Sequence, residues 1–314
     1  MKGYVAVTDN DWFAFLSQQQ DLDEVNFWQP GGRQVFRTLN PGEPFLFKLH
    51  APYHYIVGGG FFAYSTILPV SLAWSAFGIK NGASSYSEIR WLIEKNRHGI
   101  INPREDYQIG CILLSQPFFF REHDWIPIPP DFSLNIVQGK SYDLNEGHGR
   151  RLWEQVLARL SSIHPPKAED ITKIAEPEGR YGRYGEPMVI LPRLAQGIFR
   201  IMVTDAYQRR CAITQERTLP ALEAAHIKPF SESGPHSVSN GLLLRSDIHR
   251  LFDTGYVTIT ADYRFEVSKR LKEDFDNGEE YRTFHGKEIW VPPAPKYQPG
   301  PDYLSWHNEN VFRG

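Results

Sequence analysis

The segment from Leu219 to Gly255 constrains the fold of this chain more than any other, because apolar runs, turn residues and histidines alternate in it over a short distance. Residues 219–228 are largely apolar and lead to His226, and the polar stretch 229–237 follows with two prolines and a glycine. This pattern predicts a short strand that opens into an irregular loop, with His226 where the strand ends.

A second strand and a helix are expected directly after this loop. The dipeptide Asn240-Gly241 is typical of a turn, and the apolar run 242–244 suits a second buried strand. Ser246 is suited to cap the helix that follows, and Gly255 is placed to end it. The segment therefore predicts the order strand, loop, strand, helix.

This order resembles the HNH nuclease family and its ββα-metal fold. The best-matching phrases between Cys211 and Gly255 are Ala224-Ala225-His226-Ile227, Asn240-Gly241-Leu242 and His249-Arg250-Leu251-Phe252-Asp253. The resemblance implies an HNH endonuclease, an enzyme that hydrolyses phosphodiester bonds.

The chemistry of such a reaction assigns a role to each of three residues. A neutral imidazole can take a proton from water near pH 7, so His226 is the candidate general base. A divalent metal ion, Mg²⁺ or Mn²⁺, would stabilise charge on the phosphate and the leaving oxygen. His249, in the first turn of the helix, is the candidate ligand because the helix dipole disfavours imidazolium there. Asn240 is expected to brace the loop through side-chain hydrogen bonds, and His236 to be a loop residue.

One position departs from the family pattern. Many HNH enzymes carry an aspartate metal ligand just before the catalytic histidine, and this chain has Ala225 there. Glu223 lies about 6.6 Å back along the same strand face and could supply the carboxylate. Asp253 is the alternative, because it follows His249 by one helical turn. The sequence leaves both open.

The N-terminal part has a different character, with closely spaced apolar strands. Residues 4–8 and 109–114 suit strands, residues 12–16 a capped helix, and Gly58-Gly59-Gly60 a bulge or sharp bend. With the turn Pro41-Gly42-Glu43-Pro44, these features resemble the PUA-like superfamily that includes EVE, YTH and SRA modules. The resemblance implies a β-barrel with helices that receives a base swung out of the DNA duplex.

An aromatic cage for such a base needs stacking and hydrogen-bonding side chains. Each of the aromatic candidates also suits an ordinary core position. The candidates for stacking are Trp28, Phe62, Tyr64 and Trp74, and those for hydrogen bonding are Ser71 and Asn81.

The expected fold class is α+β, with an N-terminal PUA-like β-barrel and a C-terminal ββα-metal HNH domain. The expected domains are residues 1–140 for recognition and 186–314 for the nuclease, joined by a helical and flexible linker over residues 141–185. Three arginines near the nuclease segment are candidate contacts to DNA phosphates: Arg200, Arg209 and Arg210.

Composition bears on where the protein is located and on which kinds of metal site and membrane segment it can have. The two cysteines, Cys111 and Cys211, are too few for a disulfide scaffold or a four-cysteine zinc site, so we expect a cytoplasmic protein with no structural zinc. The chain shows neither a signal peptide nor an apolar run long enough to span a membrane. A net charge of −3 means that DNA contact must come from local basic patches.

The sequence thus predicts a metal-dependent DNA endonuclease that resembles modification-dependent restriction enzymes, which defend bacteria against phage DNA. Double-stranded DNA with methyl- or hydroxymethylcytosine is the expected partner. Cutting both strands with one HNH site per chain would favour a homodimer. Two alternatives stay open: a DNA-binding protein with an inactive HNH unit, because of Ala225, and an HNH nuclease indifferent to modification.

Overall fold

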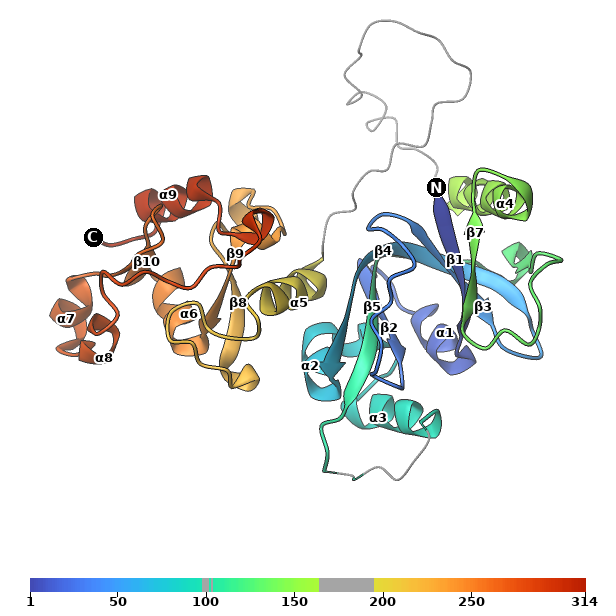
Figure 1. Ribbon diagram of the computed structural model, residues 1–314, viewed down its shortest axis with the longest axis horizontal. Helices are drawn as coiled ribbons and strands as arrows, with labels where there is room; N and C mark the ends of the chain where they lie inside the picture. The colour runs from blue at the N-terminus through green and yellow to red at the C-terminus, as the bar shows by residue number, and fades with distance from the viewer. Residues whose placement is uncertain (98–101, 103, 164–194) are drawn as a thin grey trace, which may run out of the picture. The chain divides into compact units, whose positions relative to one another are not determined.

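The computed structural model describes residues 1–97, 102, 104–163 and 195–314, and within these ranges the protein is a mixed α+β structure. The chain divides into two compact units, Met1–Pro192 and Arg193–Gly314 (Figure 1). Residues 164–185 of the expected linker and the first residues of the expected nuclease domain, 186–194, lie outside the described residues. Among the described helices, none has the length and apolar character needed to cross a membrane.

The N-terminal unit alternates strands with short helices. Its strands are β1 (Lys2–Thr8), β2 (Glu24–Gln29), β3 (Pro44–Leu49), β4 (Tyr55–Pro69), β5 (Gln108–Phe119), β6 (Ile126–Pro127) and β7 (Gly139–Asp143). Its α-helices are α1 (Asn10–Leu16), α2 (Val70–Phe77), α3 (Tyr86–Lys95) and α4 (Gly147–Ile163). The opening strand and helix are confirmed, and Asp9 caps α1 by accepting bonds from the amides of Asp11 and Trp12.

These strands form one sheet in the order β2-β5-β4-β3-β1-β7, with β6 paired to β4. The β1–β3 pair is parallel and the other pairs are antiparallel. The pairing among the described residues does not show this sheet closed into the barrel that the sequence led us to expect.

The glycines of β4 allow its backbone to pass close to the neighbouring strand. Gly58 has φ +159°, and a Cβ there would lie 2.3 Å from the carbonyl oxygen of Phe118. The register with β5 shifts between Gly59 and Phe61 and again between Phe62 and Tyr64. The bulge expected at the glycines is therefore present and bends the longest strand of the sheet.

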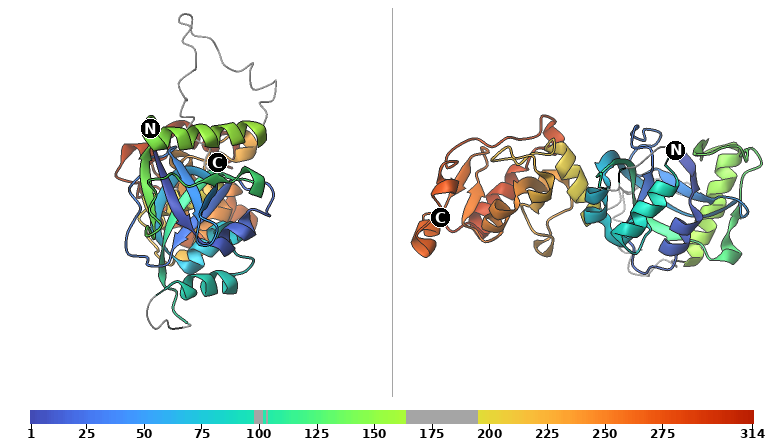
Figure 2. Two further views of the ribbon diagram at one scale, coloured as in Figure 1. Left: turned by 90° about the vertical axis from the view of Figure 1, so that its right-hand side faces the viewer. Right: turned by 90° about the horizontal axis from the view of Figure 1, so that it is seen from below.

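Helix α4 belongs to the folded N-terminal unit. In Figures 1 and 2 it lies beside β7, and its buried Leu152, Trp153 and Val156 join a cluster with Val5 of β1. Because β7 pairs with β1 and α4 covers that cluster, this unit includes more of the chain than the residues 1–140 expected for it.

The C-terminal unit is built on a short hairpin surrounded by helices. Its strands are β8 (Leu222–His226), β9 (Gly241–Arg245), β10 (Val257–Ile259) and β11 (Phe265–Val267). Its α-helices are α5 (Gln196–Ala206), α6 (Ser246–Asp253), α7 (Arg270–Phe275), α8 (Glu279–Arg282) and α9 (Pro301–Asn310). The predicted order of strand, loop, strand and helix is confirmed in β8, β9 and α6, although Arg245, not Ser246, occupies the helix N-cap.

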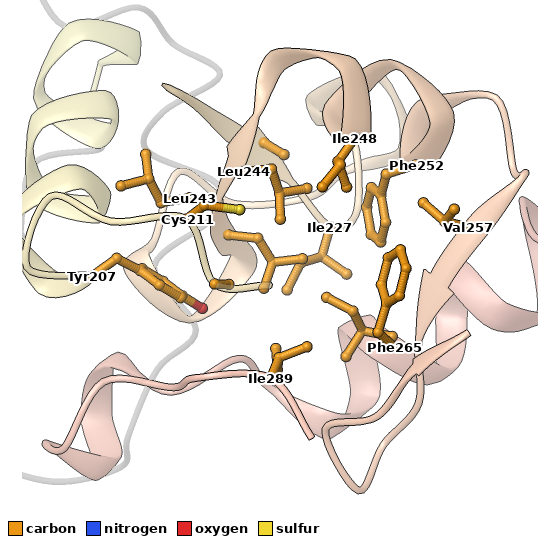
Figure 3. Close-up of a cluster of buried hydrophobic side chains, with 14 of the residues drawn as sticks. Tyr207, Cys211, Ile227, Leu243, Leu244, Ile248, Phe252, Val257, Phe265 and Ile289 are labelled. Carbon is orange, nitrogen blue, oxygen red and sulfur yellow. The ribbon is translucent and has the colours of Figure 1, made fainter. Parts of the chain in front are cut away.

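Figure 3 shows how the hairpin and α6 share one core. Leu243 and Leu244 of β9 pack with Ile248 and Phe252 of α6, all at most 1% exposed. The core thus fixes α6 against the hairpin. Figure 3 also labels further members of this cluster: Tyr207, Cys211, Ile227, Val257, Phe265 and Ile289.

Helix α9 closes this unit through a buried histidine, His307. Its Nε2–H donates to the carbonyl of Phe252, 3.0 Å away, so its Nδ1 accepts from the hydroxyl of Thr258 at 2.9 Å. The ring also stacks on Phe252, with centroids 3.7 Å apart. A neutral His307 therefore satisfies both ring nitrogens and ties α9 to α6 and β10.

We expect this histidine to make the fold sensitive to acid. Burial lowers the pKa of His307 from 6.5 to about 4, partly offset by its bond to Phe252. Because the unfolded chain binds the extra proton first, this contribution is complete above pH 6.5 and is lost as the pH falls toward 4. The loss should reach on the order of 3 kcal/mol. The free energy of unfolding of the full chain, measured with denaturant between pH 4 and 7, should depend less on pH in His307→Asn than in the wild type. An equal dependence on pH in the two proteins would contradict the assignment.

Candidate functional site

His226 is the last residue of β8, the first strand of the hairpin. Its register pairs His226 with Gly241, and Ala225 points into the core, fully buried. A Cβ at Gly241 would lie 2.5 Å from Val203 and 3.0 Å from the ring of Phe199, both on α5. The glycine thus lets α5 pack directly on the hairpin, and Phe199 stacks on the imidazole of His226 with centroids 3.9 Å apart and planes 12° from parallel.

The surroundings of His226 keep its imidazole neutral. Burial, and after it the repulsion of a positive charge by the neighbouring His236 and His249, lower the pKa of His226 from 6.5 to about 4. Near neutral pH one ring nitrogen therefore carries a lone pair, as a general base requires. A DNA phosphate at the site would raise this pKa again, because an anion favours imidazolium.

Asn240 braces the loop between the two strands, the role that the sequence suggested for it. Its side chain is fully buried, and its Oδ1 accepts from the backbone amide of Lys228 at 2.9 Å. Its Nδ2 donates to the carbonyls of Lys228 and Pro235, both at 2.9 Å. With these bonds the amide is committed to the backbone, so we do not place it on the substrate.

His249 lies on α6 between two carboxylates. Its Nδ1 is 2.7 Å from Oε2 of Glu223, and its Nε2 is 3.3 Å from Oδ2 of Asp253. The two carboxylates that the sequence left open as substitutes for the missing aspartate therefore both reach His249, one at each ring nitrogen.

These residues surround a cleft of about 320 Å³ on the C-terminal unit. His226, His249 and Asp253 line it, so the candidate base and the candidate metal ligands face one space. The other lining residues are Gln196, Ala224, Ile227, Pro229, Phe230, His307 and Val311.

Two of the three side chains at His249 are arranged so that they could bind one divalent ion together. No group of three His, Cys, Asp or Glu side chains within the described ranges is arranged to hold a metal, because Glu223 and Asp253 lie at opposite nitrogens of one ring. Neighbouring ligands of an octahedral Mg²⁺ are about 3 Å apart, close to the 3.3 Å between Nε2 and the Asp253 carboxylate. His249 and Asp253 thus fit one ion, with Glu223 orienting the imidazole through Nδ1–H.

The three candidate arginines have different surroundings. Arg209 forms an ion pair with Asp205 at 3.2 Å, and Arg210 lies over the ring of Trp290. Arg200 is half-buried, and burial lowers its pKa while Glu223 raises it. Arg200 therefore interacts electrostatically with Glu223, the carboxylate that is bonded to His249.

Of the six candidate base-binding residues in the N-terminal unit, Trp28 and Asn81 are bonded to each other. Trp28 is buried and its indole N–H donates to the carbonyl of Asn81. Asn81 is fully buried, with its amide bonded to Asn26, Ala73 and Gly78. The indole N–H of Trp28 and the side-chain amide of Asn81 therefore already have hydrogen-bond partners inside the core.

The other four candidates contact different neighbours. Phe62 is buried, and its ring centroid lies 5.5 Å from that of Phe36. Ser71 donates its hydroxyl to Asp106. Trp74 is paired with Tyr86 at a centroid distance of 6.5 Å. Tyr64 faces Leu113 in the register of the β4–β5 pair.

The N-terminal unit instead has a cavity of about 670 Å³ in which Trp28 is the one member of that set. The segment from Pro30 to Thr38 forms much of its wall. Aromatic and polar side chains elsewhere in its lining include Tyr4, Asp9, Trp12, Phe27, His50 and Gln138, and the aliphatic Val7 and Val137 also line it. The sequence signal that could have found it is the Gly31-Gly32-Arg33 turn after the aromatic strand.

Comparison with known proteins identifies the C-terminal segment. Residues 211–260 match the model of the family described as HNH endonuclease. The C-terminal unit contains an HNH endonuclease domain. The matched residues include the hairpin, α6 and the two histidines of the cleft, His226 and His249. HNH endonucleases are phosphodiester hydrolases and are generally metal-dependent.

The whole chain has more distant matches. One solved structure, described as a modification-dependent TagI restriction endonuclease, aligns over 98% of this chain and 81% of its own, at 13% sequence identity and a TM-score of 0.28. No curated protein matches the sequence.

Two histidines of the HNH unit were not singled out for the site from the sequence. His236, expected only as a loop residue, contacts His226, and His307 lines the cleft from α9. His307 lies outside the matched segment, so no motif signalled it, whereas His236 follows the glycine and proline of the loop that the motif contains.

Replacing His226 by alanine tests the candidate base. We expect cleavage to fall by roughly 10²–10⁴-fold, because the base acts on the attacking water. DNA binding should persist, since that proton transfer contributes nothing to the ground-state complex. Single-turnover cleavage and DNA binding of the full chain measure the two effects, and a variant that cuts nearly as well as wild type would refute the assignment.

A second set of variants separates the two carboxylates. Asp253→Asn should weaken Mn²⁺ binding more than Glu223→Gln, because the carbonyl oxygen of the glutamine side chain can still accept the Nδ1–H bond that orients His249. His249→Ala should weaken it most. Titration of the full chain with Mn²⁺ by calorimetry gives the affinities. The opposite ranking of the two carboxylate variants would make Glu223 the ligand.

Proposed function

We propose that this protein is a metal-dependent DNA endonuclease whose N-terminal unit selects DNA that carries a modified base. The observation that supports the catalytic part is the cleft of the HNH domain, where a neutral His226 faces the same space as His249 and Asp253. The proposal includes a role in restriction of foreign DNA.

The residues of the cleft divide the chemistry between them. His226 takes the proton of the water that attacks the phosphorus atom. A divalent ion held by His249 and Asp253 would stabilise the negative charge that develops on the phosphate and the leaving oxygen. Glu223 keeps the imidazole of His249 turned toward the cleft, and Arg200, which interacts with Glu223, is the candidate for a phosphate contact.

Selectivity is proposed for the cavity of the N-terminal unit. The HNH hairpin offers few side chains for the edges of bases, so sequence or modification must be recognised elsewhere. A base swung out of the duplex can stack on aromatic rings and bond through its Watson–Crick edge. The cavity holds such rings, and Asp9 is the one carboxylate among the described residues that line it. A carboxylate accepts a bond from the exocyclic amine of cytosine.

The proposal has three further parts. A PUA-like barrel for the N-terminal unit, methyl- or hydroxymethylcytosine as the preferred base, and a homodimer that cuts both strands belong to it. Two rival functions are a DNA-binding protein with an inactive HNH unit, because Ala225 replaces the usual aspartate, and a nuclease indifferent to modification.

Cleavage of paired plasmids tests the proposal. With Mg²⁺ or Mn²⁺, the full chain should cut plasmid that carries modified cytosine faster than the same plasmid without it. Equal cutting of both would support the indifferent nuclease, and binding of modified DNA without cutting would support the inactive unit.

Asp9→Asn makes this test specific to the cavity. Asparagine caps a helix as well as aspartate does, so α1 should stay intact. The loss of the acceptor should weaken binding and cutting of DNA that carries modified cytosine by roughly 5–100-fold. Trp74→Ala is the matched control, because Trp74 does not line the cavity in the described part of the chain. Preference lost in the control but kept in Asp9→Asn would move the base-binding site to Trp74.

A further inference from the structure

A second histidine lies against the candidate general base. His236, in the loop between β8 and β9, places its Nδ1 at 2.9 Å from Nε2 of His226. The planes of the two rings are 68° apart and their centroids are separated by 4.9 Å, so one ring points its edge at the other. This geometry is that of a hydrogen bond between imidazoles.

Both rings of the pair are clamped by aromatic side chains. His236 stacks on Phe230, with centroids 4.9 Å apart and planes 16° from parallel. His226 stacks on Phe199 of α5 at 3.9 Å. The loop that carries His236 is itself fixed, because Asn240 bonds the carbonyl of Pro235, the residue before it. The contact between the imidazoles is therefore held from both sides.

The direction of this hydrogen bond decides which nitrogen of His226 is basic. A neutral imidazole has one N–H and one lone pair. If His236 donated, His226 would carry its proton on Nδ1 and its lone pair would be used by the bond. If Nε2–H of His226 donates, the lone pair lies on Nδ1, which has no hydrogen-bond partner among the described residues.

We propose that His236 is a positioning residue that accepts the Nε2–H of His226 and so keeps the lone pair on Nδ1 for the attacking water. This inference rests on the proposed role of His226 as general base. His236 touches neither water nor phosphate in this scheme, and it acts only through its neighbour.

The same bond helps after the proton has moved. When Nδ1 of His226 takes a proton from water, the water oxygen bonds to phosphorus and the imidazole becomes a cation that still donates its Nε2–H to His236. A hydrogen bond from a charged donor is roughly twice as strong as a neutral one. His236 therefore stabilises the protonated base more than the neutral base, which favours the transition state over the ground state.

Three substitutions separate this role from simple packing. His236→Phe keeps an aromatic ring to stack on Phe230 but has no acceptor. His236→Asn places an amide group near the former Nδ1 and can still accept. His236→Ala removes both. In single-turnover cleavage by the full chain we expect His236→Phe and His236→Ala to lose roughly 10–100-fold, and His236→Asn to recover most of that loss.

Two further readouts distinguish positioning from structure. DNA affinity and Mn²⁺ affinity should be unchanged in His236→Phe. In ¹⁵N spectra of histidine-labelled protein, the His226 signal, assigned by its absence in His226→Ala, should show a proton on Nε2 in the wild type and a mixture of tautomers in His236→Phe. The double variant His226→Ala/His236→Phe should cut no more slowly than His226→Ala alone.

The outcomes separate the two assignments. If His226→Ala keeps full activity, the general base and its positioning residue both fall. If His226→Ala is inactive while His236→Phe cuts like the wild type, only His236 is overturned. A His226 that keeps its proton on Nδ1 in the wild type also overturns the proposal. His123→Phe, at an exposed side chain of the N-terminal unit, gives the effect of an unrelated histidine-to-phenylalanine change.

Discussion

The loop beside the candidate cleft depends on one buried amide, that of Asn240. Asn240 joins the residue that lies just after the first strand of the hairpin to the carbonyl that precedes His236, so the loop closes on itself through side-chain bonds to its own backbone. Buried backbone groups must find partners, and a loop of this kind lacks a neighbouring strand to supply them. The amide thus helps to fix the position of His236 relative to the end of β8, together with the bond between His236 and His226.

The other half of the site depends on the core under α6. Leu243 and Leu244 hold Ile248 and Phe252, and the same helix presents His249 and Asp253 on its outer side. Glu223 approaches from β8, on the strand that also carries His226. Hairpin and helix therefore each contribute residues to the cleft, and displacing either element would disturb the contact between Glu223 and His249.

The sequence predicted the parts of this protein that are encoded locally. Apolar alternation and the Asn240-Gly241 turn indicated β1, α1 and the order of β8, β9 and α6 because each depends on residues close in the chain. The base-binding set was less accessible, since an aromatic side chain such as Trp28 suits a core and a cage equally. Sequence could not show that Asn81 bonds its amide to three partners inside that core.

The features that the sequence did not predict depend on contacts that no local sequence pattern encodes. His236 meets His226 because Phe230, Asn240 and the turn at Gly234 bring the loop back, and no periodic pattern encodes that return. Packing of α4 on the sheet similarly depends on β7 pairing with β1, which joins the two ends of the N-terminal unit.

Because α9 packs against the hairpin unit, the folded HNH domain extends beyond the segment that matches the family, residues 211–260. His307 and Val311 form part of the cleft wall, yet both lie beyond the matched residues 211–260. An excised motif would leave the carbonyl of Phe252 and the hydroxyl of Thr258 without the imidazole that joins them. The portable unit of this nuclease, for grafting or for fusion to another recognition domain, is thus the whole segment from α5 through α9, and partial release of α9 would open the cleft without altering a residue of the motif.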